Sequence, residues 1–206
     1  RKELLDGKKE SAQEIFNLAS DKPVILFLGG SQGATTINDF VLSITNDLLK
    51  NYEVIHVAGP KNYKIIALES KAMISKDLQN YYHLHQYLDE IELKQAYKVA
   101  DIIVSRAGSG SIFEIAALGK PSILIPLPSA ASNHQFKNAY QYSKSGAALV
   151  VEQDNLTSNL FLGQISYILS RQKEMSNYAL KFAKPGAAEA ISKEIINFLE
   201  AISEKK

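Results

Sequence analysis

The stretch PVILFLGGSQGATTIN, residues 23–38, decides the fold of this chain. Its apolar run, residues 24–28, is too short for a helix and is typical of a strand buried on both faces of a parallel sheet. The turn GGSQG follows at once, with Gly29, Gly30 and Gly33, and apolar residues at helical spacing come next. A strand, a glycine turn and a helix direct backbone N–H groups and the positive end of a helix dipole at one spot. The stretch therefore predicts a phosphate site, with a merely tight strand-to-helix turn as the alternative.

Composition limits the class of protein. The 206 residues suffice for one large domain, and 46% apolar with 22% charged residues is ordinary for a globular chain. A formal net charge of +1 gives no electrostatic case for binding nucleic acid. The absence of cysteine excludes disulfides and is compatible with a cytoplasmic setting. No apolar run approaches the roughly 20 residues that cross a bilayer, so we expect any membrane contact to be peripheral.

The rest of the chain alternates strand patterns with helix patterns. Strands are expected at residues 24–28, 53–57, 81–88, 101–105, 121–126 and 147–151. Helices are expected at residues 9–20, 37–51, 63–74, 89–99, 111–118 and 133–144, and from residue 156 to the end with one break at residues 184–186. This alternation predicts an α/β fold, a Rossmann-like open parallel sheet with helices on both faces. Since no linker or repeat interrupts it, we expect a single domain over residues 1–206.

In such a sheet ligands bind beyond the carboxyl ends of the strands. The turns at residues 29–33, 87–89, 106–111 and 126–135 are therefore expected to share one rim. The second glycine turn, residues 108–111, opens another helix, and a ligand with two phosphates or a phosphate and a sugar would use both turns. A dinucleotide fits poorly, because Leu28 occupies the first glycine position of its fingerprint and the second strand ends without a carboxylate.

Two polar groups on this rim have two interpretations each. Glu114 forms a capping box with Ser111, or its carboxylate accepts hydrogen bonds from the vicinal hydroxyls of a ribose. The spacing does not separate these two. Residues 132–135 also fit a capping box, while the pair His134 and Gln135 could instead bind the hydroxyls of a sugar. For that pair, capping is the interpretation that spacing alone favours.

Two segments together resemble the MurG family of glycosyltransferases. They are GGSQGATTIN, residues 29–38, and SRAGSGSIFEIAALGKPSILIPLPSAASNHQFKNA, residues 105–139, and the likeness covers nearly the whole chain. That family transfers N-acetylglucosamine from UDP-N-acetylglucosamine to lipid I, an undecaprenyl-pyrophosphoryl-N-acetylmuramoyl-pentapeptide, and makes lipid II for peptidoglycan. The resemblance implies a GT-B architecture of two facing Rossmann-like domains, of which this chain would be the C-terminal, donor-binding one. A start at Arg1 without methionine leads us to expect a piece of a longer chain.

The resemblance also implies residues that hold the nucleotide. Ser31 would hydrogen-bond a donor phosphate, and the backbone of Leu88 would recognise the edge of the uracil. The second glycine turn would contact the diphosphate through Ser109, Gly110 and Ser111. This turn is smaller than in some members, which puts its side-chain contacts in question and leaves its backbone contacts.

Further positions carry over to the sugars. Glu114 matches the carboxylate that binds the ribose, and Gln135 matches the glutamine that reads hydroxyls of the N-acetylglucosamine ring. His134 stands beside it, where some members have a second glutamine. Arg1 matches an arginine of the donor site.

The resemblance further implies how the reaction is divided. No Asp-x-Asp pair is present to hold a divalent ion, and we expect a metal-independent transferase without a cofactor. No general base is evident in this sequence. The resemblance places the base, the acceptor site for lipid I and the membrane-facing surface in an N-terminal domain outside this chain. We therefore expect this chain to bind the donor without turnover, within a protein at the cytoplasmic face of the membrane.

Two other functions remain open from the sequence. The chain could be a separate, non-catalytic donor-binding subunit of a split glycosyltransferase. It could also belong to a UDP-N-acetylglucosamine epimerase, which shares the two-domain architecture and would form product from the donor alone.

Overall fold

One parallel sheet forms the centre of the molecule. The computed structural model describes residues 4, 6–19, 22–30 and 33–203, and of residues 188, 199, 201 and 203 it describes the backbone alone. Within this part the sheet has six strands in the order β3-β2-β1-β4-β5-β6, and every adjacent pair is parallel. The strands are β1 (Val24–Leu28), β2 (Glu53–Val57), β3 (Tyr82–His85), β4 (Ile102–Ser105), β5 (Ser122–Leu124) and β6 (Ala148–Val150). This order is that of the Rossmann fold.

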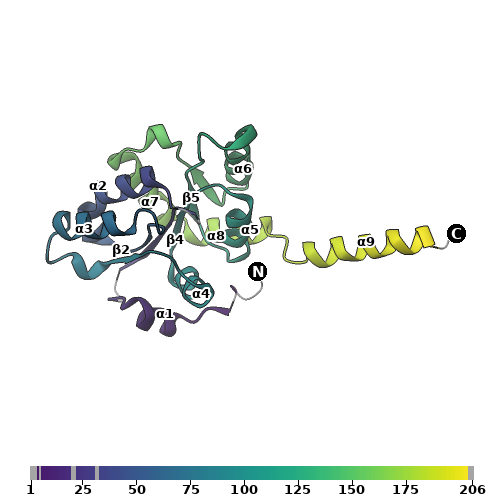
Figure 1. Ribbon diagram of the computed structural model, residues 1–206, viewed down its shortest axis with the longest axis horizontal. Coiled ribbons are helices and arrows are strands. Elements are labelled where there is room, and N and C mark those ends of the chain that lie inside the picture. Colours follow the sequence, from purple (N-terminus) through teal and green to yellow (C-terminus); the bar gives the residue numbers. More distant parts are fainter. Residues whose placement is uncertain (1–3, 5, 20–21, 31–32, 204–206) are drawn as a thin grey trace.

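Helices connect the strands and cover both faces of the sheet (Figure 1). The α-helices are α1 (Lys9–Phe16), α2 (Thr35–Asn51), α3 (Tyr63–Met73), α4 (Glu90–Val99), α5 (Ser109–Ala117), α6 (His134–Ser143), α7 (Ser158–Ser170), α8 (Gln172–Phe182) and α9 (Ala187–Ser203). Short 3-10 helices are η2 (Gln79–Tyr81), η3 (Ala131–Asn133) and η4 (Gln153–Asn155). The predicted fold class is confirmed.

The strand β1 is buried on both faces, as its apolar run predicts. Ile25 and Phe27 point into a cluster with α2 and α7, where the rings of Phe27 and Phe161 stack 6.0 Å apart. Leu26 points into the opposite cluster, which contains Tyr97 of α4 and residues of α1. Each fully buried Leu, Ile or Phe stabilises a fold by about 1.5–3 kcal/mol. The strand that leads into the first glycine turn is therefore anchored in core clusters on both faces of the sheet.

The carboxyl ends of the strands are in register. Leu28 pairs with Val57 on one side and with Ser105 on the other, and Ser105 pairs with Leu124. His85 in turn pairs with Val57, so the loops after β1, β3, β4 and β5 leave the sheet at one level. This confirms the expected common rim.

Neither of the two capping-box interpretations holds in the structure. The helix α5 begins at Ser109 with Gly108 as its N-cap, so Ser111 already has helical geometry and Glu114 does not cap it. The N-cap of α6 is Asn133, which has a left-handed φ of 53° and makes no side-chain capping bond. A capping box needs an extended N-cap residue, and neither serine occupies that position. A capping box does form at α4, between Asp89 and Glu92.

Several strands and helices are shorter than predicted. β5 comprises only Ser122–Leu124, because the flanking Pro121 and Pro126 lack the N–H that a ladder needs. β3 ends at His85, so Leu88 lies in a loop. Gly119 follows α5 with a φ of +63°, the left-handed conformation that commonly ends a helix.

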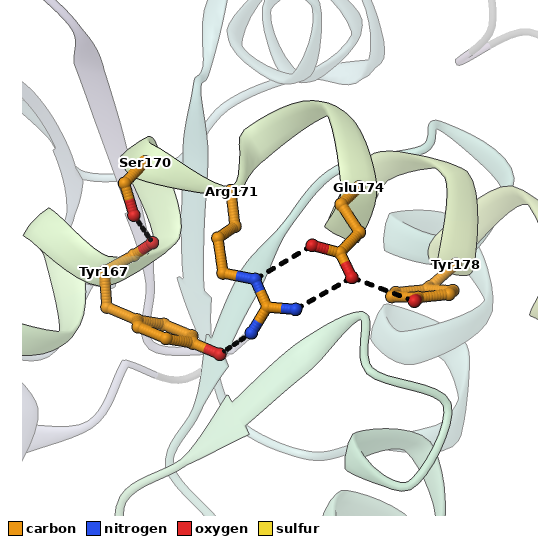
Figure 2. Close-up of polar contacts among 5 residues, drawn as sticks. All are labelled: Tyr167, Ser170, Arg171, Glu174 and Tyr178. Carbon is orange, nitrogen blue, oxygen red and sulfur yellow. Dashed lines mark hydrogen bonds and ion pairs between the residues drawn. The ribbon is translucent and has the colours of Figure 1, made fainter.

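The helical pattern after residue 156 breaks at a second place, Arg171, which the sequence analysis missed. The bend lets α8 contact two core clusters, since Met175 packs in the cluster of Phe161 and Ile165 whereas Ala179 packs beside α5. Figure 2 shows how side chains hold the bend: the Arg171 guanidinium donates to both carboxylate oxygens of Glu174, at 2.9 and 2.8 Å, and to the hydroxyl of Tyr167. A pattern of apolar residues cannot reveal this break, since Arg itself favours helices.

The helix α9 extends away from the rest of the domain (Figure 1). Several of its large apolar side chains are exposed, among them Ile191, Ile195 and Phe198. In the described residues, no helix has both the length and the apolar character that crossing a bilayer requires.

Candidate functional site

A pocket of about 240 Å³ opens at the carboxyl edge of the sheet. The ends of β1, β2 and β4 form its floor, and the loop before α4 and the first turns of α5 form its walls. Gly30, Leu88, Ser111 and Glu114, all predicted site residues, line it together. The structure therefore brings together residues from two loops and from the helix α5, as the common rim predicted. Arg1 and Ser31, also predicted, lie outside the described residues.

The first glycine turn is built so that only glycine fits at its end. Gly33 has a φ of +78°, and a β-carbon on it would lie 2.2 Å from the carbonyl oxygen of Ala58. A β-carbon on Gly29 would lie 2.8 Å from the backbone nitrogen of Ala34. The helix α2 that follows has Ala34 as its N-cap, with no side-chain capping bond. Its first N–H groups are thus not capped by that residue, which favours a bound anion.

The second glycine turn differs from the first. A β-carbon on Gly108 or Gly110 would meet nothing within 4 Å, so packing within the described chain does not require glycine there. Ser109 and Gly110 are exposed, and α5 begins without a side-chain capping bond. Glycines without an internal steric reason are what a close approach of a ligand to the backbone needs. The turn therefore offers a second set of N–H groups on the same rim.

The carboxylate of Glu114 forms one wall of the pocket. Its Oε2 accepts a hydrogen bond of 3.1 Å from the hydroxyl of Tyr97, which reaches the pocket from α4. Leu88 is 4% exposed and lies directly before Asp89, the N-cap of α4. Because the capping box fixes the start of α4, the backbone of Leu88 is held at the pocket.

His134 and Gln135 lie on the same rim but not in this pocket. Gln135 accepts a hydrogen bond of 3.0 Å at its Oε1 from the backbone N–H of Leu127, which leaves the amide Nε2 as its donor group for a ligand. His134 is exposed and its Nδ1 lies 2.8 Å from the carbonyl oxygen of Ala131, so Nδ1 carries a proton and donates. Both side chains thus also hold the loop between β5 and α6.

Sequence reasoning missed Arg106 as a connection between two loops of the site. Its guanidinium donates to the carbonyl oxygens of Ile125 and Pro126, at 3.2 and 3.3 Å, and to Oε1 of Gln153 at 2.8 Å. Burial lowers the pKa of Arg106 from its ordinary value, and the group stays charged. The second glycine turn is thereby tied to the start of the loop that leads into α6, the helix that contains Gln135. The available signal in the sequence was an arginine two residues before Gly108.

A buried polar chain supports the first glycine turn and was also missed. Asn38 donates to the carbonyl oxygen of Ala58 at 2.9 Å, and its Oδ1 lies 2.9 Å from Nε2 of His56. The other ring nitrogen of His56 lies 2.7 Å from the hydroxyl of Tyr82. Burial lowers the pKa of His56 to about 3, so the ring is neutral. These hydrogen bonds fix the Ala58 carbonyl against which Gly33 packs. The signal in the sequence was a polar residue, Asn38, on the buried face of a helix.

Titratable groups in the described part of the chain do not gather as metal ligands do. No three His, Asp or Glu side chains there lie close enough together to hold a metal ion. The pocket and the glycine turns offer backbone N–H groups, the Glu114 carboxylate and hydroxyl side chains, which suit a phosphorylated, hydroxyl-rich ligand.

Comparison with known proteins agrees with this geometry. Residues 24–195 match the glycosyltransferase family 28 C-terminal domain. A UDP-N-acetylglucosamine--N-acetylmuramyl-(pentapeptide) pyrophosphoryl-undecaprenol N-acetylglucosamine transferase of Clostridium kluyveri is 36% identical over 97% of this chain and 53% of its own length. The enzyme of that name from Thermodesulfovibrio yellowstonii is 35% identical over 100% of this chain and 55% of its own.

Solved structures give the same answer. The crystal structure of Acinetobacter baumannii MurG superposes with a TM-score of 0.75 at 26% identity, covering 94% of this chain and 55% of that one. The UDP-GlcNAc 2-epimerase of Neisseria meningitidis has a TM-score of 0.61 at 14% identity over 92% of this chain and 48% of that one, which shows a common fold alone. This chain thus spans about half the length of the relatives it matches. The resemblance to MurG is confirmed, and the chain belongs to the glycosyltransferase family 28 C-terminal domain family.

Proposed function

We propose that this chain binds UDP-N-acetylglucosamine as the donor domain of a MurG-type transferase that converts lipid I into lipid II. The observation that carries the proposal is the convergence of two helix N-termini, those of α2 and α5, on the rim where the Glu114 carboxylate lines a pocket. A nucleoside diphosphate sugar presents two phosphates and vicinal hydroxyls in that arrangement. The names of the relatives supply the sugar and the acceptor.

Each predicted residue has a role in this proposal. The uridine lies in the pocket, with its uracil edge on the backbone of Leu88 and its ribose hydroxyls on Glu114. The diphosphate lies between the two glycine turns, at Ser31 on one side and at Ser109, Gly110 and Ser111 on the other. Arg1 also contacts the donor.

The sugar lies beyond the diphosphate, toward the loop between β5 and α6. The Nε2 group of Gln135 donates to hydroxyls of the N-acetylglucosamine ring, and His134 lies beside it. The hydrogen bond that Gln135 accepts from Leu127 orients its amide for this role.

The proposed site favours departure of UDP. When the glycosidic bond breaks, negative charge grows on the β-phosphate oxygen of the leaving group. Helix dipoles and N–H groups fixed before the reaction stabilise such charge at little cost of reorganisation. The acceptor hydroxyl loses a proton to a general base, which we place in an N-terminal domain outside this chain, together with the lipid I site. We also place the whole protein at the cytoplasmic face of the membrane, with peripheral contact mainly through that domain.

Calorimetric titration tests the proposal. The 206-residue chain is titrated with UDP-N-acetylglucosamine, UDP, UDP-glucose and NAD. We expect heat from the uridine ligands, the strongest affinity for UDP-N-acetylglucosamine, and none from NAD. Binding of NAD with no response to UDP would contradict the nucleotide assignment.

The reaction is tested on a chain extended N-terminally to the length of its relatives. With UDP-N-acetylglucosamine and lipid I, it should release UDP only when lipid I is present. Release of N-acetylmannosamine from the donor alone would instead indicate an epimerase. Catalysis that requires a separately encoded partner would indicate a split glycosyltransferase.

A further inference from the structure

Tyr97 lies where the hydrophobic core meets the pocket. Its side chain is 2% exposed, and its ring packs against apolar residues of α1 and of the central strands, among them Phe16 and Leu26. Its hydroxyl reaches the pocket wall and donates to Oε2 of Glu114 at 3.1 Å. A tyrosine ring anchored in this way has little freedom, so its hydroxyl is a fixed donor.

Such a donor can fix the orientation of the Glu114 carboxylate. It is the sixth residue of α5, past the first turn, and the helix start does not use its carboxylate as a cap. A glutamate side chain loses considerable rotamer freedom when it is fixed in one orientation. A donor that orients the carboxylate before a ligand arrives removes that loss from the binding step.

We propose that Tyr97 is a positioning residue for the nucleotide, because its hydroxyl orients the Glu114 carboxylate to accept hydrogen bonds from vicinal ribose hydroxyls. This inference rests on the proposed function. An ionised carboxylate has about four acceptor sites, so it can accept from Tyr97 and from ligand hydroxyls at the same time. Tyr97 belongs to α4 and Glu114 to α5, so the bond also links the helix that follows Leu88 to the helix that starts at the second glycine turn.

The test compares UDP with 2′-deoxy-UDP, which lacks one ribose hydroxyl, by calorimetric titration of the 206-residue chain. The variants are Tyr97→Phe, Glu114→Gln and a matched control, Tyr142→Phe. Tyr142 is also fully buried, and its hydroxyl has no hydrogen-bond partner among the described residues. The control removes the same atom from a cluster of α5, α6 and α8 that does not form the pocket.

The wild-type chain should prefer UDP to 2′-deoxy-UDP. Glu114→Gln should lower both the affinity for UDP and the preference for UDP over 2′-deoxy-UDP. Tyr97→Phe should lower the affinity for UDP by about threefold to tenfold and should also reduce this preference. Tyr142→Phe should leave both unchanged. In the Glu114→Gln background, Tyr97→Phe should cause little further loss, because the carboxylate it orients is already altered.

The outcomes separate the claim that Glu114 binds the ribose from the claim that Tyr97 orients Glu114. Equal affinity of the wild-type chain for the two nucleotides would overturn the ribose role of Glu114, and with it this inference. A Tyr97→Phe chain that keeps the full preference, while Glu114→Gln loses it, would overturn the inference alone. Tyr97→Phe could also lower the affinity for UDP in the Glu114→Gln background as much as it does in the wild-type chain. That result would show that Tyr97 acts through the core, and it would overturn the inference even if Tyr97→Phe is less stable.

Discussion

Gly33 and Ala58 are so close that a β-carbon on Gly33 would stand 2.2 Å from the Ala58 carbonyl oxygen. That oxygen also accepts a hydrogen bond from the side chain of Asn38. The end of β2 and the glycine turn after β1 are therefore packed backbone to backbone. The position of the first helix N-terminus at the rim depends on this contact.

Gly33→Ala should destabilise the chain by at least about 2 kcal/mol, since it adds both a steric clash and a left-handed φ that alanine adopts at a cost. Denaturant unfolding measures the change. Gly163→Ala is the control: Gly163 lies exposed in α7 with open space around it, and alanine there should stabilise by about 0.5–1 kcal/mol. A Gly33→Ala chain as stable as wild type would contradict the packing described.

Gly110→Ala should separate stability from binding. Nothing lies within 4 Å of a β-carbon at Gly110, and alanine favours a helical position, so the melting temperature should stay the same or rise. The affinity for UDP should nevertheless fall by about tenfold, because a methyl group blocks close approach of the diphosphate to the backbone. Calorimetric titration measures it, and Gly163→Ala should bind like wild type. Unchanged affinity for UDP in Gly110→Ala would place the diphosphate elsewhere.

His56 should make stability depend on pH. Burial lowers its pKa to about 3, while the unfolded chain has a value near 6.5, so between these values the unfolded state binds the extra proton. The stability from the neutral ring is complete above about pH 6.5 and is lost as the pH falls toward 3, by up to about 1.4 kcal/mol per pH unit. The free energy of unfolding of His56→Gln should fall less steeply from pH 6.5 to 4. If the free energy of unfolding fell equally steeply with pH in the wild-type and His56→Gln chains, His56 would not be held neutral in the fold.

Gln135→Ala should weaken the binding of UDP-N-acetylglucosamine by about tenfold and change that of UDP little, because only the sugar contacts this amide in our proposal. Titration of one chain with both ligands measures the ratio, so UDP is the internal control. The variant also removes the acceptor of the Leu127 N–H, and we expect a small fall in melting temperature. Equal weakening of both ligands would mean that Gln135 only holds the loop.

The fold could be predicted because its main signals are local. An apolar run that continues into glycines and a helical pattern already defines a strand buried on both faces, and the structure has Ile25, Leu26 and Phe27 fully buried. The common rim followed from the parallel order, since strands in one direction end at one edge. Gly30 and Glu114, which are far apart in sequence, were thus expected on the same rim, and in the structure they line the same pocket.

Details that depend on backbone geometry were not predictable in this way. Ser111 and Glu114 have the spacing of a capping box, yet α5 begins two residues earlier at Ser109. Spacing cannot say which residue leaves the helix with an extended backbone. The bend at Arg171 was hidden for a related reason, since it depends on how α8 packs, with Met175 in the cluster of α7 and Ala179 in a second cluster.

The sequence by itself determined the strand–glycine–helix units, the parallel direction of the strands and the edge of the sheet where the site lies. These features depend on apolar periodicity and on the special conformations of glycine. Only the tertiary structure decided which side chains support that site. Tyr97 meets Glu114 across two helices, and Asn38 meets His56 across a helix and a strand. Such hydrogen bonds join residues from different elements, and their existence depends on how those elements pack.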